Sequence, residues 1–215
     1  QTVPNLGTGG TALDATLGST SGSDSNDPKW LPYEGTPYVY LPGVASNYLS
    51  TPDAAALDIT GDIDIRVKVA LDDWTPAAGQ TLVAKRTFAS SALAAYEFFI
   101  LATGILRFQW YDSGTAGFRT VDATAATGLT DGSVKWVRAT LDADNGAGGN
   151  DVMCWISDDG TTWTQLGTTV TTATVAAIQA TASAVEVGSR DSGASGSAAG
   201  KFYRAIIYSD LTSTT

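Results

Sequence analysis

The sequence of 215 residues contains no histidine and a single cysteine, Cys154. A Ser-His-Asp triad and a zinc site with histidine ligands are therefore excluded, and one thiol can form neither a metal cluster nor an internal disulfide. Cys154 shares one face of an expected strand with Val152 and Ile156, which predicts an inward-pointing apolar side chain. The fold must then be stable through its hydrophobic core.

Long apolar segments are also lacking. No run approaches the roughly 18 residues that a membrane-spanning helix needs, and no basic segment followed by an apolar one opens the chain as in a signal peptide. The sequence begins with Gln1 rather than Met, which suggests a processed product or a fragment.

Basic side chains are scarce, with 12 Lys and Arg against 22 Asp and Glu, and the formal net charge is −10. There is no basic stripe and no basic amphipathic helix. We therefore expect no nucleic-acid partner and no membrane insertion, because such an acidic surface repels phosphate groups.

Helix-favouring patterns are rare too. Glu occurs only at positions 34, 97 and 186, whereas Asp, Gly, Ser and Thr are abundant, and these residues favour turns over helices. Apolar residues alternate with polar ones in many short segments, which is typical of half-buried antiparallel strands. The expected strands cover residues 38–41, 62–70, 81–85, 96–101, 105–111, 134–141, 152–157, 163–166, 184–187 and 202–208.

This pattern predicts an all-β fold, a two-sheet antiparallel sandwich, barrel or jelly roll. Residues 1–29 are rich in Gly, Thr, Ser, Asp and Asn, so we expect an irregular N-terminal arm or linker there, of which Leu13 and Leu17 could pack on the sandwich. Residues 30–215 form the expected single domain.

Several segments of residues 30–212 resemble laminin G-like domains of the concanavalin A-like lectin/glucanase type. They are Tyr38–Gly43 with Asn47–Pro52, the alternating strand from Asp62, the Trp-containing strand Lys135–Thr140, Val185–Gly188, and the closing strand Gly200–Tyr208. The resemblance implies a jelly-roll sandwich with an irregular N-terminal arm.

The segments 5–14 and 144–151 are similar to laminin G-like modules of bacteriophage virions, particularly minor tail proteins and surface appendages. That resemblance implies a viral protein on the virion surface, outside the cell. It implies carbohydrate binding only loosely. Virion proteins are commonly multimeric, so a homo-oligomer is compatible with it.

Candidate ligand-binding residues come from the strand faces and turns. Arg107, Gln109 and Tyr111 lie opposite the apolar stripe of their strand, so Tyr111 could stack on a sugar ring while the other two donate hydrogen bonds. Trp74, in a turn, and Trp155, opposite Cys154, are further candidates. Each aromatic could equally be a packing residue.

One loop has the composition of a calcium site. Asp142, Asp144, Asn145, Asn150 and Asp151 supply oxygen atoms between two expected strands, and hard cations prefer oxygen ligands. The segment lacks the EF-hand pattern, and its Asn and Asp residues equally favour a plain turn. Calcium is therefore the one cofactor that the sequence suggests.

The enzyme hypothesis is the weakest. Asp62 and Asp64 are about 7 Å apart on one strand face, but they alternate with Ile63 and Ile65, which predicts outward, solubilising charges rather than a catalytic pair. The segment 157–163 resembles the Asp-box turn of sialidases with one residue fewer, and it supports only a hairpin.

Three functions remain. The first is a non-enzymatic virion surface or tail accessory domain that binds host-surface glycans weakly and multivalently. The second is structural decoration or assembly of the virion, through contacts with other virion subunits and without a sugar. The third is a glycan-degrading enzyme.

Overall fold

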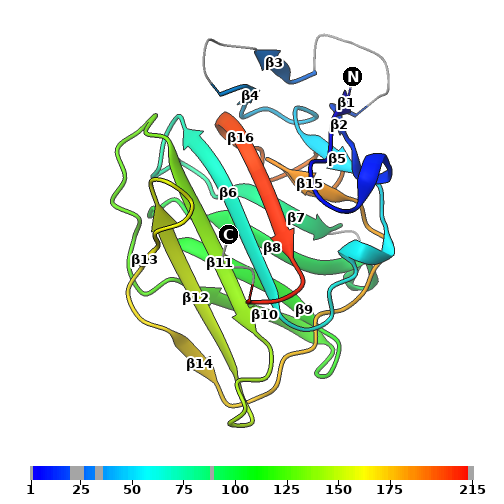
Figure 1. Ribbon diagram of the computed structural model, residues 1–215, viewed down its shortest axis with the longest axis vertical. Helices are drawn as coiled ribbons and strands as arrows, with labels where there is room; N and C mark the ends of the chain where they lie inside the picture. Colours follow the sequence, from blue (N-terminus) through cyan, green and yellow to red (C-terminus); the bar gives the residue numbers. More distant parts are fainter. Residues whose placement is uncertain (1, 20–26, 32–35, 88–89, 213–215) are drawn as a thin grey trace.

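The computed structural model describes residues 2–19, 27–31, 36–87 and 90–212, so positions 20–26 of the expected arm lie outside the described residues. The chain forms two antiparallel β-sheets that pack face to face (Figure 1). The predicted all-β jelly-roll sandwich is thereby confirmed.

Sheet A has the strand order β1-β2-β5-β15-β7-β8-β9-β10. Its strands, in chain order, are β1 (Thr2–Val3), β2 (Ala15–Leu17), β5 (Leu49–Thr51), β7 (Gln80–Arg86), β8 (Ala94–Ile100), β9 (Leu106–Asp112), β10 (Gly117–Asp122) and β15 (Val185–Val187).

Sheet B has the strand order β13-β12-β11-β6-β16-β4-β3, and β14 pairs with β12 beside β13. Its strands are β3 (Lys29–Leu31), β4 (Tyr38–Pro42), β6 (Ile63–Leu71), β11 (Lys135–Asp142), β12 (Asn150–Ser157), β13 (Thr164–Gln165), β14 (Val170–Thr172) and β16 (Ala199–Tyr208). In Figure 1 the strands β12, β11, β6 and β16 lie in front of sheet A.

Helical structure in the described residues is confined to the 3-10 turns η1 (Gly10–Leu13), η2 (Ala55–Leu57) and η3 (Ser91–Leu93). No helix in this part of the chain has the length and apolar character to cross a membrane.

The core forms where the apolar faces of the two sheets meet. Ile63, Ile65 and Val67 of β6 have no exposed surface, and the same holds for Phe98 of β8 and Phe108 of β9. Cys154 also points into this core, as predicted, and burial raises the pKa of its thiol to about 12. The apolar residues that alternate along each strand therefore hold the sheets together.

The predicted irregular arm is corrected in its first half. Strand β2 pairs with β1 and also with β5, so this half of the arm extends sheet A at its edge. Leu17 is buried in the core and Leu13 packs against it. Strand β3 crosses the expected boundary between positions 29 and 30.

A buried lysine fastens the loops at one rim of the sandwich. The Lys85 ammonium has no exposed surface and donates to the carbonyl oxygens of Thr181 and Ser183 at 2.6 and 2.9 Å. It also contacts the carboxylates of Asp53 and Asp58. One side chain thus joins the segment around η2 to the segment that precedes β15.

Candidate functional site

The face of sheet A that points away from the core carries a row in which four of five side chains are polar. The register places Glu186 of β15, Ala84 of β7, Glu97 of β8, Gln109 of β9 and Thr120 of β10 side by side. Residues in one such row share a face of the sheet. We call this surface the outer face of sheet A.

Glu97 is the centre of a buried ionic network on this face. Its carboxylate is fully buried and accepts hydrogen bonds from Arg86 at 2.7 Å, from Arg190 at 2.6 Å and from the Thr81 hydroxyl at 2.8 Å. Arg86 also donates to the Gln109 side-chain oxygen at 2.9 Å. The network fixes two guanidinium groups before any ligand arrives.

The loop after β15 covers one half of the outer face. Glu186 accepts hydrogen bonds from the backbone N–H groups of Ser192 and Gly193 at 2.7 and 3.0 Å. Burial raises the pKa of Glu186, the two backbone hydrogen bonds lower it, and the negative charges of Asp191 and Glu97 raise it further. The half formed by β9 and β10 stays open.

An aromatic pair stands on this open half. Phe118 of β10 is 43% exposed and contacts Tyr111 of β9 edge to face, with ring centroids 5.2 Å apart. The Arg86 guanidinium lies 4.9 Å from the centre of the Phe118 ring. An exposed ring beside fixed hydrogen-bond donors is the arrangement that saccharide recognition requires.

A second ion pair borders this pair of rings. Arg107 of β9 forms a two-pronged contact with Asp122 of β10, and the guanidinium lies 5.6 Å from the centre of the Phe99 ring. The hydrogen bond with Asp122 raises the pKa of Arg107, against the lowering effect of burial. The sequence-predicted trio of Arg107, Gln109 and Tyr111 thus shares one face, with Gln109 and Arg107 already held in place.

The prediction for Trp74 is wrong. This residue lies in the turn after β6, which suggested exposure, but its indole has no exposed surface and belongs to the core. Its backbone N–H donates to the Asp131 carboxylate at 2.9 Å, which draws the turn inward. A side chain placed there cannot touch a ligand on the surface.

Trp155 lies on the opposite side of the molecule, on the outer face of sheet B. In register it stands beside Arg138, and the guanidinium of Arg138 lies 5.8 Å from its ring. Asp64 occupies the same face but is fully buried, because the guanidinium groups of Arg66 and Arg138 enclose its carboxylate. The expectation that Asp64 is a solvated surface charge is therefore wrong.

The structure brings two carboxylates onto one face that sequence spacing did not show, and they are a candidate pair for the enzyme hypothesis. Glu97 and Glu186 stand two strands apart in one row, about 9.5 Å from backbone to backbone. Both are buried, with Glu97 held by two arginines and Glu186 by the covering loop. Neither carboxylate is offered to a substrate in this geometry.

The candidate calcium residues belong to the β11–β12 hairpin, where hydrogen bonds within the hairpin and its neighbour β14 engage one side-chain oxygen each of Asp144, Asn145 and Asp151. Asn145 accepts hydrogen bonds from the N–H groups of Ala147 and Gly149, and Asp144 accepts one from Gly146. Asp151 accepts hydrogen bonds from the Asn145 amide and the Thr171 hydroxyl.

The other two candidate calcium residues, Asp142 and Asn150, lie outside the turn. The amide of Asn150 donates to the Thr174 carbonyl at 2.6 Å. Desolvation raises the pKa of Asp142, and the charges of Asp62 and Asp151 raise it further. Within the described residues no group of three acidic or thiol side chains is arranged to hold a metal ion.

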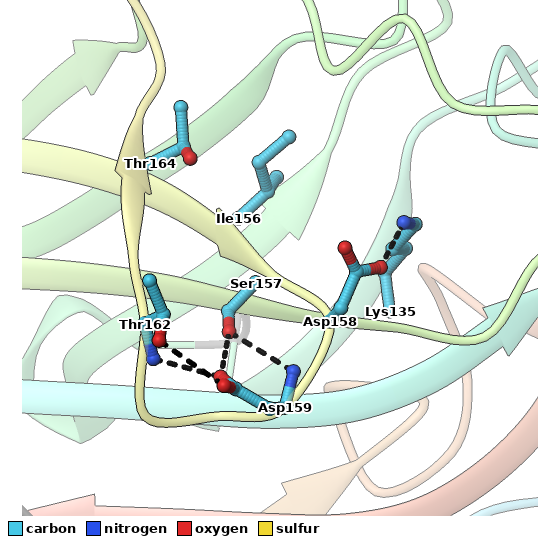
Figure 2. Close-up of a pocket in the computed structure, with 7 residues that line it drawn as sticks. All are labelled: Lys135, Ile156, Ser157, Asp158, Asp159, Thr162 and Thr164. Atoms are coloured by element: carbon cyan, nitrogen blue, oxygen red, sulfur yellow. Dashed lines mark hydrogen bonds and ion pairs between the residues drawn. The ribbon is translucent and has the colours of Figure 1, made fainter.

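A shallow cavity of about 370 Å³ lies beside the Asp-box-like turn (Figure 2). Asp159 accepts hydrogen bonds from the N–H groups of Thr161 and Thr162 at 2.8 and 2.7 Å, which lowers the pKa of its carboxyl group. Asp158 pairs with Lys135 across the cavity mouth. The hairpin expected from this motif is present, and its polar groups are engaged in the turn.

Three residues of the outer face of sheet A escaped sequence analysis: Arg86, Glu97 and Phe118. Every residue of β8 is buried, so alternation could not separate its two faces. Strand β10 was not predicted, because a single large apolar residue, Val121, faces the core from it. The isolated Glu97 in an apolar strand was the one available signal.

Comparison with solved structures finds domains that share this fold. The chain resembles the CBM40 domain of the Ruminococcus gnavus IT-sialidase bound to α2,3-sialyllactose, with 14% identity, a TM-score of 0.52, and coverage of 74% of this chain and 82% of that one. A further structure of the Ruminococcus gnavus IT-sialidase CBM40 domain gives the same identity and TM-score, with coverage of 89% and 96%.

The receptor-binding domain of the botulinum neurotoxin mosaic serotype C/D is also similar, with 8% identity and a TM-score of 0.63. That match covers 99% of this chain and 48% of the toxin domain, so the chain spans about half of that structure. Identities this low establish a shared fold. No protein-family model and no curated protein sequence matches the chain.

Proposed function

We propose that this domain is a non-enzymatic carbohydrate-binding module whose ligand lies on the open half of the outer face of sheet A. The observation that carries the proposal is the exposed Phe118, in edge-to-face contact with Tyr111 and above the fixed guanidinium of Arg86. The lectin-like fold and the sialyllactose bound by a structural neighbour support it.

In this mechanism a sugar ring stacks on the aromatic pair and fixed polar groups recognise its substituents. Arg107 uses two of its five donors in the pair with Asp122 and is 30% exposed, so its outward edge can meet hydroxyl or carboxylate oxygens. Because these groups are held before binding, the ligand loses little affinity to ordering them.

The surface is open, so a single contact is expected to be weak. Display of many copies would raise the overall affinity through effective concentration. We place the module on a virion surface or tail, outside the cell, with a host-surface glycan as its partner. That placement rests on the sequence resemblance to phage modules described above.

A structural role in virion decoration or assembly is the second candidate. One observation favours it: Leu6, in the connection between β1 and β2, is 82% exposed and offers an apolar contact to a neighbouring subunit. The β1–β2 hairpin would then be the attachment element, with other virion subunits as partners.

A glycan array that includes α2,3-sialyllactose, probed with multivalent protein, tests the leading proposal. We expect binding to a defined glycan class, with at least tenfold weaker binding for Phe118→Ala. Val134→Ala removes a similarly exposed apolar side chain, 41% exposed, directly before β11 and serves as the matched control. Binding that Phe118→Ala leaves unchanged overturns the assignment of the face.

The same array run with a calcium chelator tests the hairpin residues Asp142 to Asp151. Loss of binding on chelation would assign calcium a role there. The absence of binding to every glycan, with multivalent display included, overturns the carbohydrate proposal and leaves the structural role.

A further inference from the structure

The basic side chains without a carboxylate partner gather at one place. Of the basic side chains that the structure describes, eight lie within ion-pair distance of an Asp or Glu. The remaining three have no such partner among the described residues. They are Lys68, Lys201 and Arg204, and all three lie on the adjacent strands β6 and β16.

These three cations point to the outer face of sheet B. Arg204 and Lys68 are directly opposite each other in the β6–β16 pairing, and Lys201 stands opposite Ala70 in the same ladder. The neighbours Val67 and Val69 face the core, so Lys68 must face outward. Like charges directly opposite each other destabilise a sheet. A protein with 22 acidic residues has the means to neutralise this pair, yet leaves it unpaired.

Two tyrosine rings lie between the cations. The rings of Tyr38 on β4 and Tyr203 on β16 have centroids 5.6 Å apart. The Lys201 ammonium lies 5.4 Å from the Tyr38 ring, and the Lys68 ammonium lies 5.6 Å from the Tyr203 ring. Such contacts hold ammonium groups in position without neutralising them. We call Tyr38, Lys68, Lys201, Tyr203 and Arg204 together the basic–aromatic face.

The surroundings of this face do not cancel its charge. In the next row of sheet B, Arg66 and Arg138 enclose the carboxylate of Asp64, so that carboxylate is already engaged by two guanidinium groups. Asp72, at the end of β6, accepts a hydrogen bond from the Tyr40 hydroxyl at 2.9 Å. Within the described residues, Lys68, Lys201 and Arg204 thus stand together without an ion-paired carboxylate, in a protein whose formal net charge is −10.

We propose that the basic–aromatic face binds an acidic saccharide, that is, a sugar carrying a carboxylate, sulfate or phosphate group. The anionic group would lie between Lys68 and Arg204 and relieve their repulsion, and the sugar ring would pack on Tyr38 and Tyr203. A nucleic acid fits less well, because three cations match one or two anionic groups while the net charge repels a long polyanion.

This site is independent of the one on sheet A, because the two outer faces point away from each other across the core (Figure 1). The molecule would then present one saccharide surface on each side. A result that overturns this proposal would leave the function proposed for the outer face of sheet A unaffected, and the reverse also holds.

Titration calorimetry with three oligosaccharide probes tests it: one carrying uronic acids, one sulfated, and one neutral of the same length. We expect the acidic probes to bind and the neutral one to bind at least tenfold more weakly, with an affinity that falls as salt rises. The two acidic probes distinguish carboxylate from sulfate recognition.

Lys68→Gln and Arg204→Gln should each weaken acidic-probe binding by at least fivefold without lowering the thermal unfolding temperature, because each removes a like-charge contact. Lys135→Gln, which removes a cation paired with Asp158, is the matched control. Phe118→Ala should leave this binding unchanged, which separates the site from that on sheet A.

Four outcomes would overturn the proposal. The first two are equal affinity for acidic and neutral probes and no binding to either acidic probe. The other two are acidic-probe binding that is unchanged in both glutamine variants and a stronger affinity for a short single-stranded oligonucleotide.

Discussion

Asp64 and Arg138, 74 positions apart in the chain, are joined by two hydrogen bonds of 2.9 and 2.8 Å on the outer face of sheet B. Arg66, two residues along β6 and therefore on the same face, donates to the same carboxylate at 2.7 Å. The Trp163 ring lies within 5.6 Å of both guanidinium groups. An ion cluster on the outside of a sheet is thereby removed from solvent.

Asp64→Asn should lower the free energy of unfolding by about 3–5 kcal/mol, because it removes the buried negative charge that Arg66 and Arg138 enclose. Urea denaturation at neutral pH measures the effect. Asp158→Asn removes an ion pair whose acid is 84% exposed, and it should cost about 0–1 kcal/mol. A loss below about 1 kcal/mol for Asp64→Asn would show that the cluster adds little to stability.

Glu186 should give stability a dependence on pH. Its pKa is raised above the ordinary value by burial, so the folded protein keeps this proton at a pH where the unfolded chain has lost it. Its contribution is greatest below about pH 4.5, declines as pH rises through the raised pKa, and is constant above that.

Denaturation of the native protein and of Glu186→Gln, from pH 4 to pH 8, measures this contribution. The stability of the native protein relative to the variant should fall with rising pH over that window. A difference that stays flat, or that rises with pH, would contradict the direction of the shift.

Gly160→Ala should destabilise the fold by about 2–4 kcal/mol. Gly160 has φ +79°, and a Cβ atom there would lie 2.8 Å from Cε2 and Nε1 of Trp136. The left-handed conformation costs an alanine about 1 kcal/mol, and overlap with a buried ring adds about 1–3 kcal/mol. Thermal unfolding followed by tryptophan fluorescence would report both stability and the environment of Trp136.

Gly128→Ala provides the matched control for that substitution. Gly128 has φ +61°, and no atom lies within 4 Å of the Cβ that it would gain. It should therefore show only the conformational cost of about 1 kcal/mol. Equal losses for the two variants would mean that the Trp136 ring moves aside freely.

Cys154 should resist thiol reagents until the protein unfolds. The side chain is 3% exposed, and burial raises the pKa of the thiol to about 12, so little thiolate exists at neutral pH. Labelling by a thiol-reactive disulfide in increasing urea should track the unfolding transition measured by fluorescence. Rapid labelling of the native protein would show local opening of β12.

The alternation of side chains made most of the fold predictable from sequence. Strands β6 and β9 alternate clearly, so their inner and outer residues were assigned correctly, and Arg107, Gln109 and Tyr111 were placed on one face. Short strands such as β5 and β14 escaped prediction, because three residues are too few to establish a period.

The candidate site was less predictable, because its charged groups depend on contacts between distant segments. Arg190 reaches Glu97 from a loop 93 positions away, and no local pattern shows this. Trp74 lies in a turn of polar residues, where local sequence indicates exposure, but the turn folds onto the core. Burial of such residues is decided by tertiary packing.

The buried Lys85, at the rim of the sandwich, affects which solutions the domain tolerates. The oxygen atoms around Lys85 come from two carboxylates and two backbone carbonyls, a set that a hard metal ion could also satisfy. Here the positive charge is covalently attached to the chain. It cannot be diluted away or extracted by chelators, so the order of this rim does not depend on a dissolved metal ion.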